Sequence, residues 1–281
     1  MDRYPAPRDP IVPGCRQPGG RVPVRTAVRR KLGCIMLVLA LDTSTPAVTT
    51  GLVRVLLPNE VIEALQAGRP AAPVQLLAER RLDDAFGHAE HLMPLTGAAV
   101  AEAGASLSDL NAVVVGLGPG PFTGLRVGVA TAEALGDALG VPVYGVASHD
   151  GVALSIELPA EPADGRPPGH FLVVTDARRR EIYASAFDGA ARRIFGPAVM
   201  APAALPGRVA ELTVEPVALT GAGSDLAGLD LPRLTTGSTA LGLVKAAVHK
   251  MVTGTVPGPL TPLYLRRPDV REPAGPKPVL A

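Results

Sequence analysis

The stretch GLGPGPFTGLRVG at residues 116–128 joins an apolar segment to a helical one, and a glycine-rich loop in that place often holds a phosphate. Neither of the two named phosphate motifs is present. Pro121 stands where the third glycine of a dinucleotide fingerprint belongs, and no lysine lies between Lys31 and Lys245 to complete a Walker A loop. The loop therefore predicts only a generic anion site, made by backbone N–H groups at a helix N-terminus.

Two clusters of residues could form such an anion site. One is the start of the helix in this loop, and the other is a polar turn that follows the apolar run 36–41 and offers a carboxylate and hydroxyls. The competing interpretation is purely structural: a tight strand-to-helix turn capped by Thr123, and an ordinary Asx turn after the first strand. The expected vestigial anion or nucleotide contacts are Gly118, Gly120, Thr123, Asp42, Thr43 and Ser44.

Metal and nucleophile chemistry find weaker support in the sequence. His88 and His91 lie three residues apart on one helical face, but two histidines need a third ligand to hold a metal. His149, Asp150 or Asp176 could supply one only if the fold brings them close. No G-x-S-x-G nucleophile elbow occurs. We therefore expect no metal site and no catalytic residue.

The apolar periodicity predicts the elements that position these residues. Gly140 and Pro142 are expected to end the helix that follows the glycine loop. Strands are predicted at 36–41, 47–57, 74–82, 112–116, 143–146, 171–175, 182–187, 193–195 and 217–220, and helices at 60–67, 88–103, 123–139, 201–212 and 238–252. A strand meander followed by crossover helices thus occurs twice, which predicts an α/β protein of two duplicated lobes with a ligand cleft between them.

The first 35 residues differ from the rest in composition. They carry eight basic and two acidic side chains, whereas residues 36–281 carry the remaining 19 and 24. Both cysteines, Cys15 and Cys34, also lie there, so the body holds no disulfide or thiolate metal site. We interpret residues 1–35 as a disordered basic extension, or as a misassigned start with Met36 as the true one. The apolar run that follows lacks a signal cleavage site and is too short to span a membrane, so we expect a cytoplasmic protein.

Five segments of the chain resemble those of a known family. The segments MLVLALDTSTPAVTTGLV at 36–53, HAEHLMPL at 88–95, GLGPGPFTGLRVGVATAEALG at 116–136, VTDARRREIYASAFD at 174–188 and PLYLRRPD at 262–269 are similar to the TsaB (YeaZ) family. The resemblance implies the actin/Hsp70/sugar-kinase (ASKHA, RNase H-like) fold. It places a first lobe at 36–146, a second and more divergent lobe at 147–272, and a tail at 273–281.

The resemblance also implies a role beside catalysis. TsaB-like proteins pair with a catalytic paralogue, TsaD, which transfers threonylcarbamoyl to N6 of the adenosine 3′ of the anticodon in tRNA. An ATPase, TsaE, joins the assembly. We therefore expect a scaffold subunit without activity or cofactor of its own, with ATP or ADP in the assembled complex, tRNA contacted indirectly, and a homodimer when alone. The resemblance places the partner interface on the first-lobe helices, at His88, His91, Leu92, Leu95, Leu125, Arg126 and Val129.

Two other functions remain open at this stage. An active small-molecule kinase of the same fold needs Asp-Gly-Thr-type phosphate hairpins, and neither 42–44 nor 176–178 has that sequence. A metallopeptidase would need ligands beyond the His88 and His91 pair. The two histidines also lack the H-x-x-x-H spacing of the metal-binding paralogue.

Overall fold

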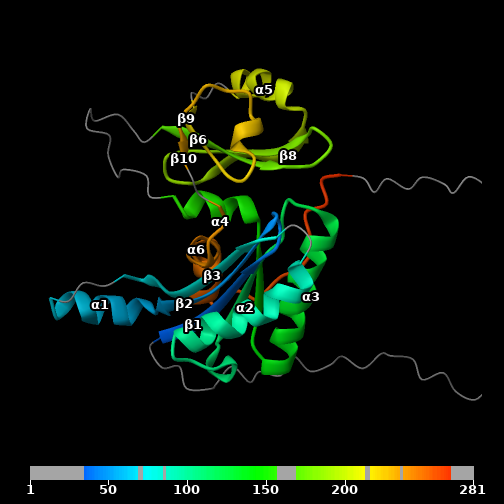
Figure 1. Ribbon diagram of the computed structural model, residues 1–281. Coiled ribbons are helices and arrows are strands. Elements are labelled where there is room, and N and C mark those ends of the chain that lie inside the picture. The colour runs from blue at the N-terminus through cyan, green and yellow to red at the C-terminus, as the bar shows by residue number, and fades with distance from the viewer. Residues whose placement is uncertain are drawn as a thin grey trace, which may run out of the picture. The chain divides into compact units, whose positions relative to one another are not determined.

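A computed structural model describes residues 35–68, 72–84, 87–156, 169–212, 216–234 and 237–266. The predicted extension, apart from Ile35, and the predicted tail at 273–281 lie outside the described residues. The described chain forms two five-stranded mixed sheets with helices packed on them (Figure 1). This confirms the predicted α/β fold of two duplicated lobes.

The first sheet is built around a strand that is apolar up to its last residue. Its strands run in the order β3-β2-β1-β4-β5. They are β1 (Ile35–Asp42), β2 (Ala47–Leu56), β3 (Val74–Asp83), β4 (Ala112–Gly116) and β5 (Val143–Val146), with α1 (Pro58–Gln66) inserted between β2 and β3. The first three strands form an antiparallel meander, and β4 and β5 are added in parallel. Because β1 and β4 are covered on both faces, they consist of unbroken apolar residues rather than an alternating pattern.

Helices from distant parts of the chain cover the two faces of this sheet. On one face, α2 (His88–Glu102) and α3 (Phe122–Leu139) pack in a core with Leu39, Leu41 and Val113 (Figure 1). The opposite face packs against α6 (Ala240–Val252) through Val38, Val53 and other buried residues. Chain order alone would assign α6 to the second sheet, yet its apolar side lies on the first.

The N-terminus of α6 is fixed by two hydrogen bonds. The hydroxyl of Thr239 accepts from the backbone N–H of Gly242 at 3.0 Å, which makes it the side-chain cap. The carboxylate of Glu79, on β3, accepts from the N–H of Ala240 at 2.7 Å. Burial raises the pKa of Glu79, partly offset by this hydrogen bond and by Arg81. A carboxylate at this position also complements the positive end of the helix dipole.

The second sheet repeats the arrangement of the first. Its order is β10-β9-β6-β7-β8. The strands are β6 (His170–Asp176), β7 (Ile182–Phe187), β8 (Arg193–Met200), β9 (Pro216–Thr220) and β10 (Arg233–Leu234), and the helices beside them are α4 (Ser148–Leu154) and α5 (Leu205–Glu211). Three 3₁₀ turns complete the fold: η1 (Leu107–Asp109), η2 (Pro202–Ala204) and η3 (Ser224–Leu226). The strands β6, β7 and β8 form the antiparallel meander, and β9 pairs with β6 in parallel.

Three local predictions differ from the structure. The sequence reading has no helix at α4, because seven residues give less than two turns of apolar period. The helix predicted at 201–212 begins as the 3₁₀ turn η2 before α5 continues it. The strand predicted at 193–195 extends to Met200.

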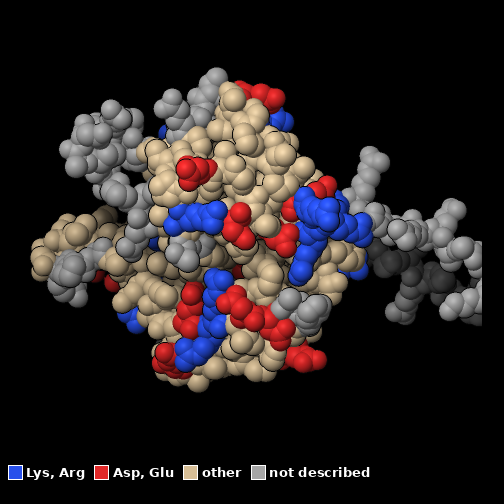
Figure 2. Space-filling view, turned by 45° about the horizontal axis from the view of Figure 1, so that its top comes forward, with Lys and Arg blue, Asp and Glu red and all other residues tan. Residues whose placement is uncertain are grey.

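The surface of the described residues is of mixed charge. In Figure 2, basic and acidic side chains lie side by side, with one larger basic group at the right of the view. No broad surface of one sign occurs among the described residues on the face shown, so a nucleic-acid duplex would find no extended basic face there. Among the same residues, no helix has the length and apolarity to cross a membrane.

Candidate functional site

The two predicted anion-contacting segments lie against each other in the first lobe. The carboxylate of Asp42, at the end of β1, accepts hydrogen bonds from the N–H of Ser44 at 2.8 Å and from the hydroxyl of Ser148 at 3.2 Å. That hydroxyl in turn accepts from the N–H of Gly118 at 3.1 Å. Asp42, Ser44 and Ser148 are each about 98% buried. The fold therefore brings Asp42, Ser44 and Gly118 together, and Ser148 links the carboxylate of Asp42 to the N–H of Gly118.

Close packing between the same segments depends on glycines of the loop and of α3. A Cβ atom on Gly120 would lie 2.1 Å from the carbonyl oxygen of Ser44, and one on Gly124 would lie 2.5 Å from that of Thr43. The hydroxyl of Thr43 also donates to the carbonyl of Gly124 at 2.7 Å. Backbone thus meets backbone at these positions, and the loop serves as a packing surface for the turn after β1.

The predicted cap of α3 is wrong. The N-cap residue is Pro121, which has no side-chain hydrogen bond to offer, and Thr123 lies exposed in the first turn of the helix. The helix therefore starts without a side-chain cap: Pro121 has a φ of −59° and an extended ψ of 135°, and the helical residues follow it.

Two polar atoms of the turn after β1 have no hydrogen-bond partner among the described residues. They are the second carboxylate oxygen of Asp42 and the hydroxyl of Ser44. A free carboxylate oxygen repels an anion and attracts a cation or a water molecule. The turn therefore retains one carboxylate oxygen that disfavours a phosphate and one hydroxyl that can donate a hydrogen bond.

The histidines of α2 make structural contacts. His88 donates from Nε2 to the carbonyl oxygen of Thr45 at 2.8 Å, which ties α2 to the turn after β1. His91 Nε2 lies 3.2 Å from a carboxylate oxygen of Asp84. No group of three or more His, Cys, Asp or Glu side chains in the described ranges is arranged to hold a metal ion.

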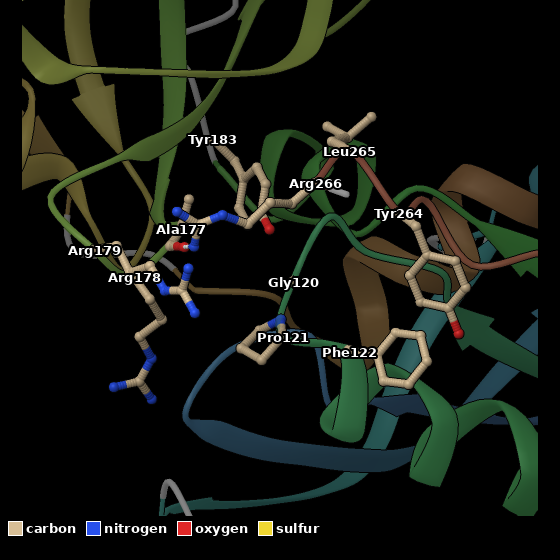
Figure 3. Close-up of a pocket in the computed structure, with 10 residues that line it drawn as sticks. All are labelled: Gly120, Pro121, Phe122, Ala177, Arg178, Arg179, Tyr183, Tyr264, Leu265 and Arg266. Carbon is tan, nitrogen blue, oxygen red and sulfur yellow. Dashed lines mark hydrogen bonds between the residues drawn. The ribbon is translucent and has the colours of Figure 1, made fainter. Parts of the chain in front are cut away.

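A cleft of about 750 Å³ lies between the glycine loop, the β6–β7 hairpin and the segment after α6. Ten residues line it, drawn in Figure 3: Gly120, Pro121, Phe122, Ala177, Arg178, Arg179, Tyr183, Tyr264, Leu265 and Arg266. The rings of Phe122 and Tyr264 lie side by side at one end of the cleft, and Arg178 and Arg179 lie at the other end (Figure 3). Gly120 and Pro121 lie between these two ends. The ring pair Phe122–Tyr264 and the arginine pair Arg178–Arg179 thus lie at opposite ends of one cavity.

The aromatic end of the cleft is a small stack. The ring centroids of Phe122 and Tyr264 are 4.8 Å apart with a tilt of 35°. The guanidinium of Arg126 lies 3.7 Å from the centroid of Phe122, which is cation–π geometry. Its Nε also lies 3.4 Å from the Tyr264 hydroxyl. Phe122 and Tyr264 are still 44% and 43% exposed, so this stack has accessible aromatic surface.

The segment after α6, residues 260–266, ties the two lobes together beside the cleft. Its Leu263 N–H donates to the carbonyl of Leu117 in the glycine loop at 2.8 Å. Arg266 donates to the carbonyl of Ala177 at 3.1 Å and pairs with the carboxylate of Glu181, both on the β6–β7 hairpin. We call this segment the C-terminal strap. Sequence reasoning missed its part in the cleft, although the aromatic and basic residues of 262–266 were a visible signal.

The turn of the β6–β7 hairpin has an unusual backbone. Arg178, Arg179 and Arg180 have φ values of 62°, 54° and 63°, in the left-handed region that favours glycine. The carboxylate of Asp176 accepts from the N–H of Arg178 at 2.7 Å and helps to hold the turn. All three arginines are exposed. The fold therefore maintains a costly conformation that presents three guanidinium groups to solvent.

A second buried network joins α4 to the second sheet. The ring nitrogens of His149 lie 2.8 Å from the hydroxyl of Ser185 and 2.9 Å from that of Thr175. Burial, reinforced by the charge of Arg193, lowers the pKa of His149 from 6.5 to about 3. The imidazole is therefore neutral, with one nitrogen donating and the other accepting. The sequence suggested His149 only as a metal ligand, whereas its ring is fully engaged by hydroxyls.

Three of the predicted partner-interface residues belong to the core. Leu92, Leu125 and Val129 are 1%, 0% and 7% exposed and pack between the helices and the first sheet. Their apolar spacing marks the inner face of α2 and α3, so they cannot contact a partner directly. Leu95 is partly buried against the same core, His88 and His91 are half-buried, and Arg126 is exposed.

The outer faces of these two helices carry a different set of residues. They are mostly small and uncharged: Ala89, Met93, Pro94, Gly97, Ala98 and Ala101 on α2, and Thr123, Ala130, Ala134 and Ala138 on α3. Exposed charged side chains accompany this set: Glu90 and Glu102 on α2, and Arg126, Glu133 and Asp137 on α3. We call the uncharged set the α2/α3 face.

Comparison with known proteins identifies the family. A family model described as TsaD, tRNA N6-adenosine threonylcarbamoyltransferase, matches residues 84–263. The chain belongs to this family. Within it, the chain is 42% identical over 238 residues to an uncharacterized protein of Mycobacterium tuberculosis, a match that covers 84% of this chain and 95% of the relative. A tRNA N6-adenosine threonylcarbamoyltransferase of Variovorax paradoxus is 46% identical over 77 residues, which is 27% of this chain and 22% of that enzyme.

A solved structure supports the fold assignment. YeaZ from Pseudomonas aeruginosa superposes with a TM-score of 0.59 at 23% sequence identity, over 82% of this chain and all of that one. The TsaD-family chain described here therefore has the two-lobe architecture seen in YeaZ.

Proposed function

We propose that this chain is the non-catalytic, TsaB-type subunit of a tRNA threonylcarbamoylation complex. In this role it pairs with a catalytic TsaD paralogue, which transfers threonylcarbamoyl to N6 of the adenosine 3′ of the anticodon. An ATPase of the TsaE type completes the assembly, and ATP or ADP binds in the complex. Membership of the TsaD family and the YeaZ-like fold support this proposal.

The observation that carries the proposal is the α2/α3 face. Small side chains such as Gly97, Ala98 and Ala101 leave the backbone of α2 accessible, and a Cβ atom on Gly97 would meet nothing within 4 Å. Two helices with small residues at the contact can approach closely, which favours helix-to-helix docking. A paralogue of the same fold offers equivalent helices, so a pseudo-symmetric pair can form through this face.

The turn after β1 supports the proposal of a non-catalytic role. In a phosphotransferase of this fold, that turn would present free donors to a phosphate. Here the backbone N–H of Ser44 in that turn, and the N–H of Gly118 in the glycine loop packed against it, are both used within the lobe. The segment thus acts as structural support for α3, which carries half of the α2/α3 face.

The test is complex formation with the TsaD paralogue of the same host. The purified chains are mixed at micromolar concentration and examined by gel filtration with light scattering, where a 1:1 complex is expected. Met93→Glu and Gly97→Glu place a charge on the α2/α3 face and should abolish the complex. Leu65→Glu is the matched control, because Leu65 is 61% exposed on α1, away from that face.

Activity provides a second measurement. The mixture of this chain, TsaD and TsaE should incorporate labelled threonine into tRNA, and the two α2 variants should reduce that incorporation as far as omission of the chain does. Two unmixed peaks for the unmodified proteins, together with full incorporation in the absence of this chain, would refute the proposal.

A further inference from the structure

The cleft beside the C-terminal strap has the chemistry of a nucleic-acid site. Its aromatic end offers partly exposed rings on Phe122 and Tyr264, with the planar guanidinium of Arg126 stacked on Phe122. Every nucleobase has a flat face that stacks on such groups, so this kind of binding does not depend on the base sequence. The opposite end presents Arg178 and Arg179, as Figure 3 shows.

The charge around the cleft favours an anion. Five arginines lie on or beside its walls, against two carboxylates that lie near them. Glu181 pairs with Arg266, and Asp176 accepts the N–H of Arg178. The arginines are Arg126, Arg178, Arg179, Arg180 and Arg266. They belong to three separate segments, namely α3, the β6–β7 turn and the strap, so the positive charge is spread along the cleft.

The distribution of the arginines along the cleft fits a nucleic-acid polymer better than a mononucleotide. A mononucleotide gathers its phosphates at one point, where proteins usually converge backbone N–H groups at a glycine loop and helix start. In this chain the N–H of Gly118 is bonded to Ser148, and Gly120 packs against Ser44. A single strand of RNA instead distributes phosphates and bases along its length, which matches separate guanidinium and aromatic groups.

The β6–β7 turn adds an independent indication. Three consecutive arginines occupy left-handed conformations that glycine or asparagine would adopt at lower cost. Residues held in such sparsely populated conformations cluster at functional sites, where they fix the position of a side chain. Here all three side chains carry guanidinium groups, which bind phosphates bidentately.

From these observations we propose that the cleft binds a single-stranded segment of RNA, with a base stacked at Phe122 and Tyr264 and phosphates at Arg178 and its neighbours. The choice of RNA as the polymer rests on the proposed function, in which tRNA is the substrate of the complex. On that basis the chain contacts the substrate directly, in addition to its role as a scaffold.

The test is fluorescence anisotropy with the full chain alone and a fluorescein-labelled, single-stranded RNA of about 12 nucleotides. Phe122→Ala and Tyr264→Ala should each weaken binding about fivefold or more, because each removes a stacking surface. Arg178→Gln should weaken binding and reduce the slope of log affinity against log salt concentration by about 0.7 per lost phosphate contact. All three residues are exposed, the two rings only in part, and circular dichroism of each variant checks that it is folded.

Matched controls remove an exposed large apolar side chain and an exposed arginine away from the cleft. Ile194→Ala on β8 and Arg233→Gln on β10 should bind as the unmodified chain does. These controls are needed because residues 1–35 carry eight basic side chains that can attract RNA on their own. If the cleft variants bind as well as the controls, the inference is wrong.

Competition decides between the polymer and a mononucleotide. Unlabelled single-stranded RNA should displace the probe, whereas ATP or ADP at equal phosphate concentration should not. If ATP displaces the probe and Phe122→Ala weakens ATP binding equally, the cleft is a nucleotide site and the inference is overturned.

The result is separable from the test of the proposed function. A chain that binds RNA at the cleft but forms no complex with TsaD would leave this inference intact and refute the scaffold role. A chain that forms the complex with TsaD but binds no RNA would support the scaffold role and refute this inference.

Discussion

The imidazole of His149 lies 2.8 Å from the hydroxyl of Ser185, and both side chains are completely buried where α4 meets the second sheet. Thr175 closes the network on the other ring nitrogen. Each ring nitrogen therefore has a hydroxyl partner that can match only a neutral imidazole without rearrangement. A proton added to this ring would need the hydroxyl that donates to it to reorient and would place a charge in the protein interior.

This burial predicts a pH-dependent stability. Because the pKa of His149 is about 3 when folded and 6.5 when unfolded, the unfolded chain binds more protons between these values. The stability that the neutral His149 side chain contributes is therefore complete above pH 6.5 and is lost as the pH falls toward 3. Between pH 7 and pH 4 the loss should be about 3 kcal/mol in the free energy of unfolding. Urea denaturation at the two pH values measures it.

A His149→Gln variant provides the comparison for that measurement. Glutamine retains a donor and an acceptor but does not titrate, so the variant should be less stable at pH 7 yet lose less stability on acidification. Equal losses in the two proteins would show that His149 does not govern the acid transition.

The glycines of the two first-lobe helices should respond in opposite directions to the same substitution. Gly124→Ala places a Cβ atom 2.5 Å from the carbonyl oxygen of Thr43 and should lower the free energy of unfolding by about 1–3 kcal/mol. Gly97→Ala on α2 meets nothing within 4 Å and should raise it by up to about 1 kcal/mol, because alanine is the better helix former. Thermal denaturation of both variants tests the pair, and a destabilised Gly97→Ala would contradict the open surface described for α2.

Substitutions at two neighbouring residues of α2 should have different effects, one on stability and the other on complex formation. Leu92→Ala removes a side chain that is 1% exposed and should cost about 2–5 kcal/mol. Met93→Ala, at a residue that is 40% exposed, should change stability by less than about 0.5 kcal/mol and affect only binding to TsaD. Chemical denaturation and gel filtration of each variant measure the two effects. If Leu92→Ala left stability unchanged, its place in the core would be wrong.

The left-handed turn predicts a stabilising substitution. Arg180→Gly should raise the free energy of unfolding by roughly 0.5–1 kcal/mol, because glycine adopts a φ of 63° without the steric cost that arginine bears. Arg180→Ala removes the same charge but keeps a Cβ atom, so it should not stabilise the protein. Denaturation curves that do not distinguish the two variants would show that the turn carries no backbone strain.

Elements with a long apolar period were predictable from the sequence. The unbroken run in β1 indicated a strand covered on both faces, and the structure covers it with helices on each side. The helix α3 ends at Leu139, and Gly140 follows with a φ of 66°, as the glycine and nearby proline indicated. Such signals are local, so they do not depend on the rest of the fold.

Predictions about exposure were less successful, and the reason is physical. Apolar spacing on α2 and α3 shows that each helix has a face to bury, but it does not say whether a sheet or a partner covers that face. The structure puts Leu92, Leu125 and Val129 against the sheet. The true outer face consists of small residues, which produce no periodic signal.

The two-lobe pattern predicted a cleft between the lobes, but its lining could not be predicted, for a similar reason. Phe122, Arg178 and Tyr264 are far apart in the sequence and come together only through contacts between the strap, the glycine loop and the hairpin. No local pattern reports a juxtaposition of that kind.

The position of α6 in the chain has a consequence for biosynthesis. Its residues are translated after the whole second sheet, yet they cover one face of the first. A nascent chain that has emerged only as far as β5 therefore leaves Val38, Val53 and Val114 bare while the ribosome makes the next hundred or so residues. A gene divided after residue 146 would yield two aggregating fragments, and coexpression of both would be needed to recover either one in soluble form.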